Sequence, residues 1–171
     1  PVFMNMGRVA IEKNIEAFLQ LDIDGNKVVV GDGPDLEHLQ QKYPDVTFTG
    51  AKFGRELASY VAAADVFVFP SKTDTFGLVL LEAMACGVPI AAYPVTGPAD
   101  IVQQGVTGFL DDDLTTAAKK ALRLSADDCI EYAKNHSWMA CTRVFSDFMF
   151  NNQQSSKLED TDITNHSFWC L

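Results

Sequence analysis

The sequence predicts an α/β fold, with an open parallel sheet flanked by helices and a helical C-terminal extension. Two observations predict it. Short apolar runs alternate with helical patterns in a regular order, which is typical of βαβ units around a parallel sheet. The apolar runs are also continuous rather than alternating, as in KVVV at 27–30 and VFVF at 66–69. Parallel strands that are buried on both faces have this pattern.

The expected strands and helices follow in chain order. We expect five strands, at Val2 to Met6, Lys27 to Val30, Val46 to Thr49, Val66 to Phe69 and Pro89 to Ala92. The helices expected between them are Lys13 to Gln20, Pro34 to Lys42, Arg55 to Ala63 and Gly77 to Cys86. After Asp113 the pattern becomes all-helical, with helices at Leu114 to Arg123, Ala126 to Asn135 and Trp138 to Phe150.

Composition places the chain among ordinary globular proteins of about one domain. Its 171 residues are 47% hydrophobic and 21% charged, and the formal net charge is −10. Nucleic-acid binding needs a basic face, whereas the few Lys and Arg residues here are scattered, so we expect no nucleic-acid partner. The four cysteines lack the spacing of a zinc site, which favours reduced thiols in the cytosol.

The expected organisation is one folded domain over residues 1–150 and a polar, disordered tail over residues 151–171. No stretch approaches the roughly eighteen unbroken apolar residues of a membrane span. We therefore expect a cytoplasmic protein, whose peripheral association with the inner face of a membrane would require the full-length protein. Because the chain opens at Pro1 with a strand already under way, we also expect a fragment whose first half is missing.

Two cations follow the first expected strand directly. Arg8 and Lys13 stand in GRVAIEKN at 7–14, at the sheet edge where ligands of parallel α/β folds bind. Arg holds two anionic oxygens at once and Lys supplies a point charge, so the pair suits a diphosphate. The alternative is that both are solvated surface side chains.

The stretch SKTDTFGLVLLEAMACGVP at 71–89 contains a second candidate site. A helix that begins near Gly77 would present free N–H groups and a positive dipole end to an anion, and the glycine would let a ligand come close. Asp74 precedes this helix. Glu82 lies within it among apolar neighbours, where an unpaired acid is costly to bury. Carboxylates on both sides of an anion site suit a nucleotide sugar; alternatively, Asp74 caps the turn and Glu82 faces solvent.

Two further turns follow expected strands. Gly31-Asp32-Gly33 begins like a dinucleotide fingerprint, but Leu36 stands at the third glycine position. No acid ends the next strand, which argues against a nicotinamide cofactor and favours a tight strand-to-helix turn. Thr96 and Gly97 either line the same crevice or belong to another ordinary turn.

Taken together, these residues resemble the C-terminal, donor-binding half of glycosyltransferase family 4 (group 1), whose retaining enzymes have the GT-B fold. The resemblance covers roughly residues 1–150 and implies a Rossmann-like domain. It rests on ordered motifs, namely GRVAIEKN (7–14), VVVGDGPDLEHL (28–39), VTFTG (46–50), DVFVFPSKTDTFGLVLLEAMACGVPIAAYPVTGPADIV (65–102) and SW (137–138).

The resemblance implies a role for each matching position. Arg8 and Lys13 match the pair that neutralises the donor pyrophosphate. Asp74 matches the first acid of an E-x7-E motif, which contacts the transferred sugar, and Glu82 matches the second acid, which holds the ribose hydroxyls. As catalytic residues the resemblance implies Asp74, Arg8 and Lys13. The donor-binding positions that it implies are Gly7, Gly50 near the base, Phe76, Gly77, Leu78 and Glu82.

The resemblance also implies a substrate class and its limits. The donor is a UDP- or GDP-hexose, and the acceptor is a lipid or glycan that binds through the missing N-terminal domain, so the chain alone is expected to be inactive. No cofactor or metal is expected, because cations take the phosphate charge. The motif wording is similar to that of a bacterial subgroup. Because the first acid is usually Glu rather than Asp74, the donor sugar stays open.

Two other hypotheses compete with this interpretation. The first is a non-catalytic remnant that binds a nucleotide sugar or docks onto another protein through its helical C-terminal layer. The second is a nicotinamide-dependent oxidoreductase, which has only the incomplete glycine turn at 31–33 in its favour.

Overall fold

The computed structural model of the chain describes residues 1–73 and 77–136. Residues Pro1–Ala133 form one compact unit, and within it the described strands form one parallel sheet in the order β3-β2-β1-β4-β5-β6. The strands are β1 (Val2–Met6), β2 (Asn26–Val30), β3 (Thr47–Phe48), β4 (Val66–Phe69), β5 (Ile90–Ala92) and β6 (Gly108–Leu110). The predicted open parallel sheet is therefore confirmed.

The helices connect consecutive strands, and two more follow the last strand. They are the 3₁₀ turn η1 (Ile11–Lys13), α1 (Ile15–Leu19), α2 (Leu36–Lys42), α3 (Gly54–Ala62), α4 (Leu78–Ala85), α5 (Pro98–Ile101), α6 (Leu114–Ala121) and α7 (Ala126–Asn135). No helix in the described ranges is long and apolar enough to cross a membrane. The expected helix at Trp138 to Phe150 and the expected tail at 151–171 lie outside these ranges.

One predicted helix is wrong in part, and one strand was not predicted. The expected helix from Lys13 to Gln20 is interrupted, because Asn14 adopts the left-handed conformation with φ 53° and separates η1 from α1. Strand β6 was not predicted at all. Gly108, Phe109 and Leu110 are too few for a sequence pattern, and they form a strand because they pair with Ile90, Ala91 and Ala92 of β5.

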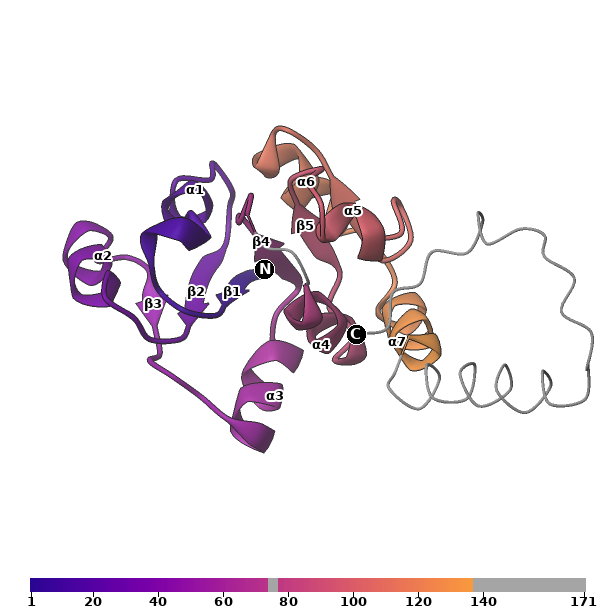
Figure 1. The fold of residues 1–171 in the computed structure, drawn as a ribbon, viewed down its shortest axis with the longest axis horizontal. Helices are drawn as coiled ribbons and strands as arrows, with labels where there is room; N and C mark the ends of the chain where they lie inside the picture. The colour runs from indigo at the N-terminus through magenta and orange to yellow at the C-terminus, as the bar shows by residue number, and fades with distance from the viewer. Residues whose placement is uncertain (74–76, 137–171) are drawn as a thin grey trace, which may run out of the picture. The chain divides into compact units, whose positions relative to one another are not determined.

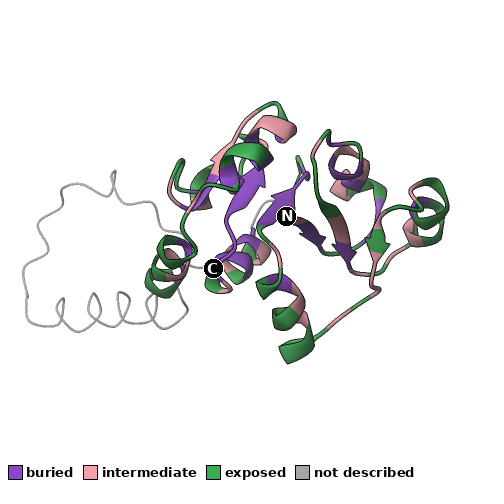
Figure 2. Ribbon diagram, turned by 180° about the vertical axis from the view of Figure 1, so that it is seen from behind, coloured by how far each residue is buried: buried purple, intermediate pink, exposed green. Residues whose placement is uncertain are grey.

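Each face of the sheet is covered by a hydrophobic layer. Alternate residues along a strand point to opposite faces, so Phe3 of β1 packs in one cluster with α1 and α6. Its neighbour Met4 packs in the other cluster, with α3 and α4. Figure 1 shows these two pairs of helices on opposite sides of the strands. In Figure 2 the central strands are buried and the outer faces of the helices are exposed.

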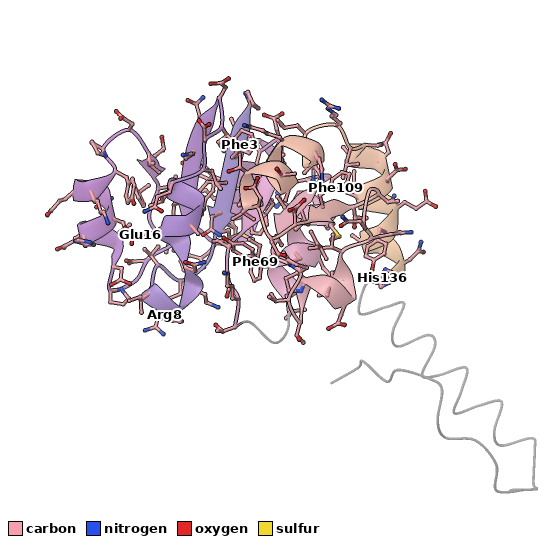
Figure 3. The ribbon with its side chains drawn as sticks, turned by 90° about the horizontal axis from the view of Figure 1, so that it is seen from above. Phe3, Arg8, Glu16, Phe69, Phe109 and His136 are labelled. Atoms are coloured by element: carbon pink, nitrogen blue, oxygen red, sulfur yellow. The ribbon has the colours of Figure 1, made fainter. Side chains whose placement is uncertain are left out.

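The direction in which successive strands are added to the sheet reverses between β1 and β4. The chain runs from β1 outward to β2 and β3, returns to β4 beside β1, and continues outward to β5 and β6. The helices that follow β1 and β4 thus lie on opposite faces and leave a crevice at the carboxyl ends of the strands, where open α/β sheets bind ligands. In Figure 3 Phe69 and Arg8 lie toward this edge and Phe3 toward the opposite one.

Candidate functional site

A cavity of about 620 Å³ opens at the carboxyl ends of β1 and β4. The end of β1 contributes Asn5, Met6 and Gly7, and the end of β4 contributes Phe69, Pro70 and Ser71. The rest of the lining comes from the segment after β1, from α3 and from α4, and consists of Arg8, Glu12, Lys13, Leu57, Leu78, Val79 and Glu82. The cavity therefore occupies the position that the sheet topology favours for a ligand.

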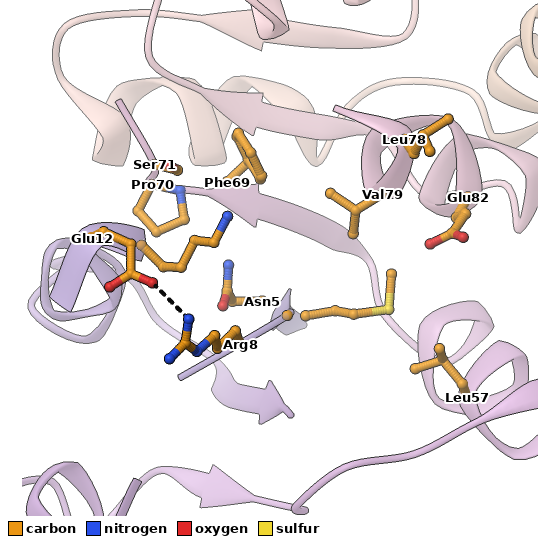
Figure 4. Close-up of a pocket in the computed structure, with 13 residues that line it drawn as sticks. Asn5, Arg8, Glu12, Leu57, Phe69, Pro70, Ser71, Leu78, Val79 and Glu82 are labelled. Carbon is orange, nitrogen blue, oxygen red and sulfur yellow. Dashed lines mark ion pairs between the residues drawn. The ribbon is translucent and has the colours of Figure 1, made fainter. Parts of the chain in front are cut away.

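The two predicted cations lie in the lining of this one cavity. Arg8 is exposed and forms an ion pair with Glu12, with 3.7 Å between Nη1 and Oε1. Lys13 is half-buried at the end of η1. Figure 4 shows Arg8, Glu12, Pro70 and Ser71 toward one end of the cavity and Leu57 and Glu82 toward the other. An anion that enters the cavity would therefore meet the guanidinium group of Arg8 at that end, and Lys13 supplies a second cation to the same lining.

The glycine turn at 31–33 holds the backbone of the segment that carries Arg8. The Gly7 amide donates to the Val30 carbonyl (3.0 Å), and the Val9 amide donates to the Asp32 carbonyl (2.9 Å). A Cβ at Gly31 would collide with the Gly7 carbonyl oxygen, and one at Gly33 with the Val9 carbonyl oxygen. Close packing of two backbones thus accounts for both glycines, as the tight-turn interpretation requires.

Helix α4 supplies the opposite wall. The first N–H groups of a helix have no partner within it, and Leu78 and Val79 of this first turn line the cavity. Helix α4 buries Leu80, Ala83 and Met84 on its other face. Glu82 is exposed rather than buried among its apolar neighbours. The expected cost of burying this acid therefore does not arise, and its carboxylate faces the open cavity.

Cys86, four residues after Glu82, is a titratable neighbour whose pKa this carboxylate affects. Partial burial, and secondarily the negative charge of Glu82, raise the pKa of the Cys86 thiol above its usual value. A protonated thiol is a poor nucleophile, so Cys86 is unsuited to covalent chemistry near neutral pH.

Among residues 1–73 and 77–136, no three His, Cys, Asp or Glu side chains form a group that could hold a metal ion. That no metal is needed stays a prediction.

The structure brings some predicted site residues together and leaves others out. Gly7, Arg8, Lys13, Leu78 and Glu82 all line the cavity, and their roles stay predictions. Asp74 and Phe76 lie outside the described residues. Other predicted positions are absent from the described lining, namely Gly50, Gly77, Thr96 and Gly97.

Two of these absent positions still lie close to the lining residues. Gly77 precedes Leu78 at the start of α4. The Gly50 carbonyl accepts from the Gly31 amide (2.9 Å), which fixes Gly50 at the same edge of the sheet.

Sequence reasoning missed three polar residues around the cavity. Asn5 is 5% exposed, and its Nδ2 donates to the Val68 carbonyl (2.9 Å). Asn14 Nδ2 donates to the Pro70 carbonyl (3.0 Å), which links the end of η1 to the end of β4. Ser71 is 1% exposed. A polar residue inside the apolar run VFMNM was a usable signal for Asn5, whereas the hydrogen bond of Asn14 depends on tertiary structure.

Comparison with known proteins identifies the family. The model described as "Glycosyl transferases group 1" matches residues 1–127. The chain belongs to the group 1 glycosyltransferases. The resemblance carried by the sequence motifs is thereby confirmed, and the six-stranded sheet corresponds to the C-terminal half of the GT-B fold.

Individual relatives of this group 1 glycosyltransferase chain match over much of its length. It is 37% identical over 157 residues to a GDP-mannose-dependent alpha-mannosyltransferase of Corynebacterium glutamicum, covering 84% of this chain and 38% of that enzyme. It is 41% identical over 119 residues to a sulfoquinovosyl transferase of Arabidopsis thaliana, covering 64% of this chain and 23% of the relative.

A solved structure gives the same result for the fold. Sucrose-phosphate synthase from Thermosynechococcus elongatus superimposes with a TM-score of 0.73 and 29% identity, covering 91% of this chain and 46% of that one. The group 1 glycosyltransferase chain thus spans less than half the length of these relatives.

Proposed function

We propose that the chain is the donor-binding domain of a retaining glycosyltransferase that moves a hexose from a nucleoside diphosphate to a lipid or glycan. The observation that supports this most strongly is the composition of the cavity. Arg8, Lys13 and Glu82 line one cavity at the switch point of the sheet. The lining also contains Glu12, which pairs with Arg8. The two cations and the other carboxylate match the alternating phosphate and hydroxyl groups of a nucleotide sugar.

Each lining group has a chemical task in this proposal. Arg8 and Lys13 neutralise the diphosphate, together with the free N–H groups at the start of α4. Negative charge builds up on the diphosphate as the bond to the sugar breaks, so fixed positive groups lower the barrier of the transfer. Glu82, at the opposite end of the cavity, accepts hydrogen bonds from the ribose hydroxyls. Asp74 contacts the transferred sugar.

The first donor to test is GDP-mannose. Relatives that share 37% to 43% of their aligned residues with this chain are named as GDP-mannose-dependent alpha-mannosyltransferases. UDP-hexoses, the other donor class that the resemblance of the sequence motifs implies, are the second class to test. The cation pair takes the phosphate charge, and the proposal therefore requires no metal ion.

Binding and transfer are separable for this chain. It spans 38% of the Corynebacterium relative, and in our proposal the acceptor binds to a further domain of the full-length protein. The domain alone therefore binds the donor without transferring its sugar.

Calorimetric titration with GDP-mannose, GDP, UDP-glucose and UDP tests the proposal. We expect saturable binding of one donor class, with one site per chain, and a loss of at least tenfold in affinity for Arg8→Ala, because a charge-assisted contact is lost. Arg123→Ala, at a residue outside the lining, is the matched control and should bind as the wild type does. Absence of binding by every nucleotide, in a sample that is folded by circular dichroism, would rule the proposal out.

A further inference from the structure

Ser71 has a buried hydroxyl group without a hydrogen-bond partner. The residue is 1% exposed, and its Oγ is the only unpartnered buried side-chain nitrogen or oxygen atom in the part of the chain that the structure describes. Other buried polar side chains are satisfied: Asn5 donates to the Val68 carbonyl, and Thr107 Oγ1 accepts from the Gln103 amide at 2.9 Å. An unmade hydrogen bond at a buried hydroxyl destabilises the fold, so Ser71 calls for an explanation.

The position of Ser71 indicates what could supply the missing partner. It is one of the residues that line the cavity. The preceding residue, Pro70, accepts a hydrogen bond from Asn14, which directly follows Lys13. Figure 4 shows Ser71 at the end of the cavity that holds Arg8, away from Glu82. Ser71 therefore lies at the end of the cavity that holds Arg8 and its partner Glu12, where a ligand could present an anionic oxygen to the guanidinium group.

We propose that Ser71 contacts the donor, with its hydroxyl donating a hydrogen bond to an oxygen of the diphosphate. This inference rests on the proposed function of the cavity. A hydroxyl group is the suitable third contact beside Arg8 and Lys13, because it adds a short, directional hydrogen bond where the two cations add charge. In the protein without ligand the hydroxyl stays unsatisfied, and donor binding satisfies it.

Ser71→Ala is the direct test, because it removes the hydroxyl and little else. GDP and GDP-mannose, or UDP and UDP-glucose if those bind the wild type, are titrated into the wild type and the variant. Ser59→Ala is the matched control, since Ser59 Oγ donates to the Arg55 carbonyl on α3 (2.9 Å) and lies outside the cavity lining. We expect Ser71→Ala to weaken the nucleoside diphosphate and the nucleotide sugar alike, by about tenfold, and Ser59→Ala to weaken neither.

Thermal unfolding without ligand supplies the second readout. Removing an unsatisfied hydroxyl should leave the midpoint of thermal unfolding of Ser71→Ala unchanged or raised. If the hydroxyl had a purely structural role, its removal would instead lower the stability of the variant. Unchanged affinity for both ligands, or a midpoint lowered by several degrees, overturns the inference. A loss confined to the nucleotide sugar also overturns it, because the hydroxyl would then face the sugar. If the wild type binds no nucleotide, the proposed function itself fails.

Discussion

Two charged residues of the cavity lining, Arg8 and Glu82, are exposed. The Arg8–Glu12 ion pair joins side chains that are 67% and 48% exposed, across 3.7 Å, and such surface pairs contribute at most about 1 kcal/mol to stability. Such a weak pair leaves Arg8 available to another anion. Glu82 is exposed on α4 as well. The conformational stability of the domain should not depend on either side chain.

The ribose contact proposed for Glu82 gives a residue-scale prediction. Glu82→Gln removes the charge of the acceptor, so we expect about tenfold weaker binding of GDP with an unchanged free energy of unfolding. The 2′,3′-dideoxy analogue of GDP makes the test specific, since it lacks the hydroxyl groups that Glu82 would hold. Wild type should prefer GDP to this analogue, and the variant should lose most of that preference, as measured by calorimetry.

The control for the Glu82→Gln experiment is Glu131→Gln, at an exposed glutamate of α7 that does not line the cavity. It should bind both nucleotides as the wild type does. A Glu82→Gln variant that keeps the full preference for the ribose hydroxyls would assign their recognition to another residue.

Residue types and spacing were sufficient to predict part of the cavity. Arg8, Lys13 and Glu82 carry charge at the ends of recognisable elements, so their place at one edge of the sheet could be predicted. The exposure of Glu82 could not be predicted, because its neighbours in sequence are apolar while only the opposite face of α4 is buried. Ser71 was missed as well, since a lone serine after a strand has no distinguishing sequence pattern.

Among the elements, the turn after β2 fixes the backbone of a segment that lines the cavity. Its two glycines let the turn pack directly against the backbone at 7–9. This segment includes Arg8 and leads into η1. The turn also binds the carbonyl of Gly50 at the start of the next connection. A glycine pair that resembles a dinucleotide motif is thus accounted for by backbone packing alone.

Gly33→Ala tests this role of the turn. An added Cβ would meet the backbone oxygen of Val9, and its carbonyl carbon and nitrogen at 2.8 Å, so we expect a loss of about 2 kcal/mol in the free energy of unfolding. Nucleotide affinity should fall too, because the segment that carries Arg8 must shift. Urea denaturation measures the first effect and calorimetry the second.

Gly50→Ala is the comparison for Gly33→Ala. An added Cβ at Gly50 meets nothing within 4 Å, and only its φ of 72° opposes the change, which costs about 1 kcal/mol. A Gly33→Ala variant as stable as Gly50→Ala would show that the two backbones do not pack as described.

Elements with a clear hydrophobic pattern in the sequence could be predicted, whereas elements that form only through contact with a neighbouring element could not. Strands β1, β2 and β4 contain the apolar runs VFM, VVV and VFVF, and these runs predict their positions in the sequence. Strand β6 has three residues and forms through its pairing with β5. The break at Asn14 likewise requires a left-handed residue, which the helical pattern around it concealed.

At the scale of the whole molecule, the sheet topology explains why the charged residues meet. Arg8 and Glu82 are far apart in sequence, and they line the same cavity, at opposite ends, because β1 and β4 are neighbours at the switch point. The helices that follow these strands pack on opposite faces and leave the edge between them open. The site is therefore a consequence of the fold, to which the sequence adds two cations and the carboxylates of Glu12 and Glu82.

The most direct test of the proposed donor site is to locate where a nucleotide sugar binds to the chain. Backbone amide shifts of the isotope-labelled chain, recorded by NMR during titration with GDP-mannose and with UDP-glucose, report where a nucleotide sugar binds. We predict that one of the two shifts the amides of Gly7, Arg8, Lys13, Leu78 and Val79, with little effect on α2 and α6. Saturable shifts confined to another part of the described chain, or none with either donor, would contradict the assignment of this cavity.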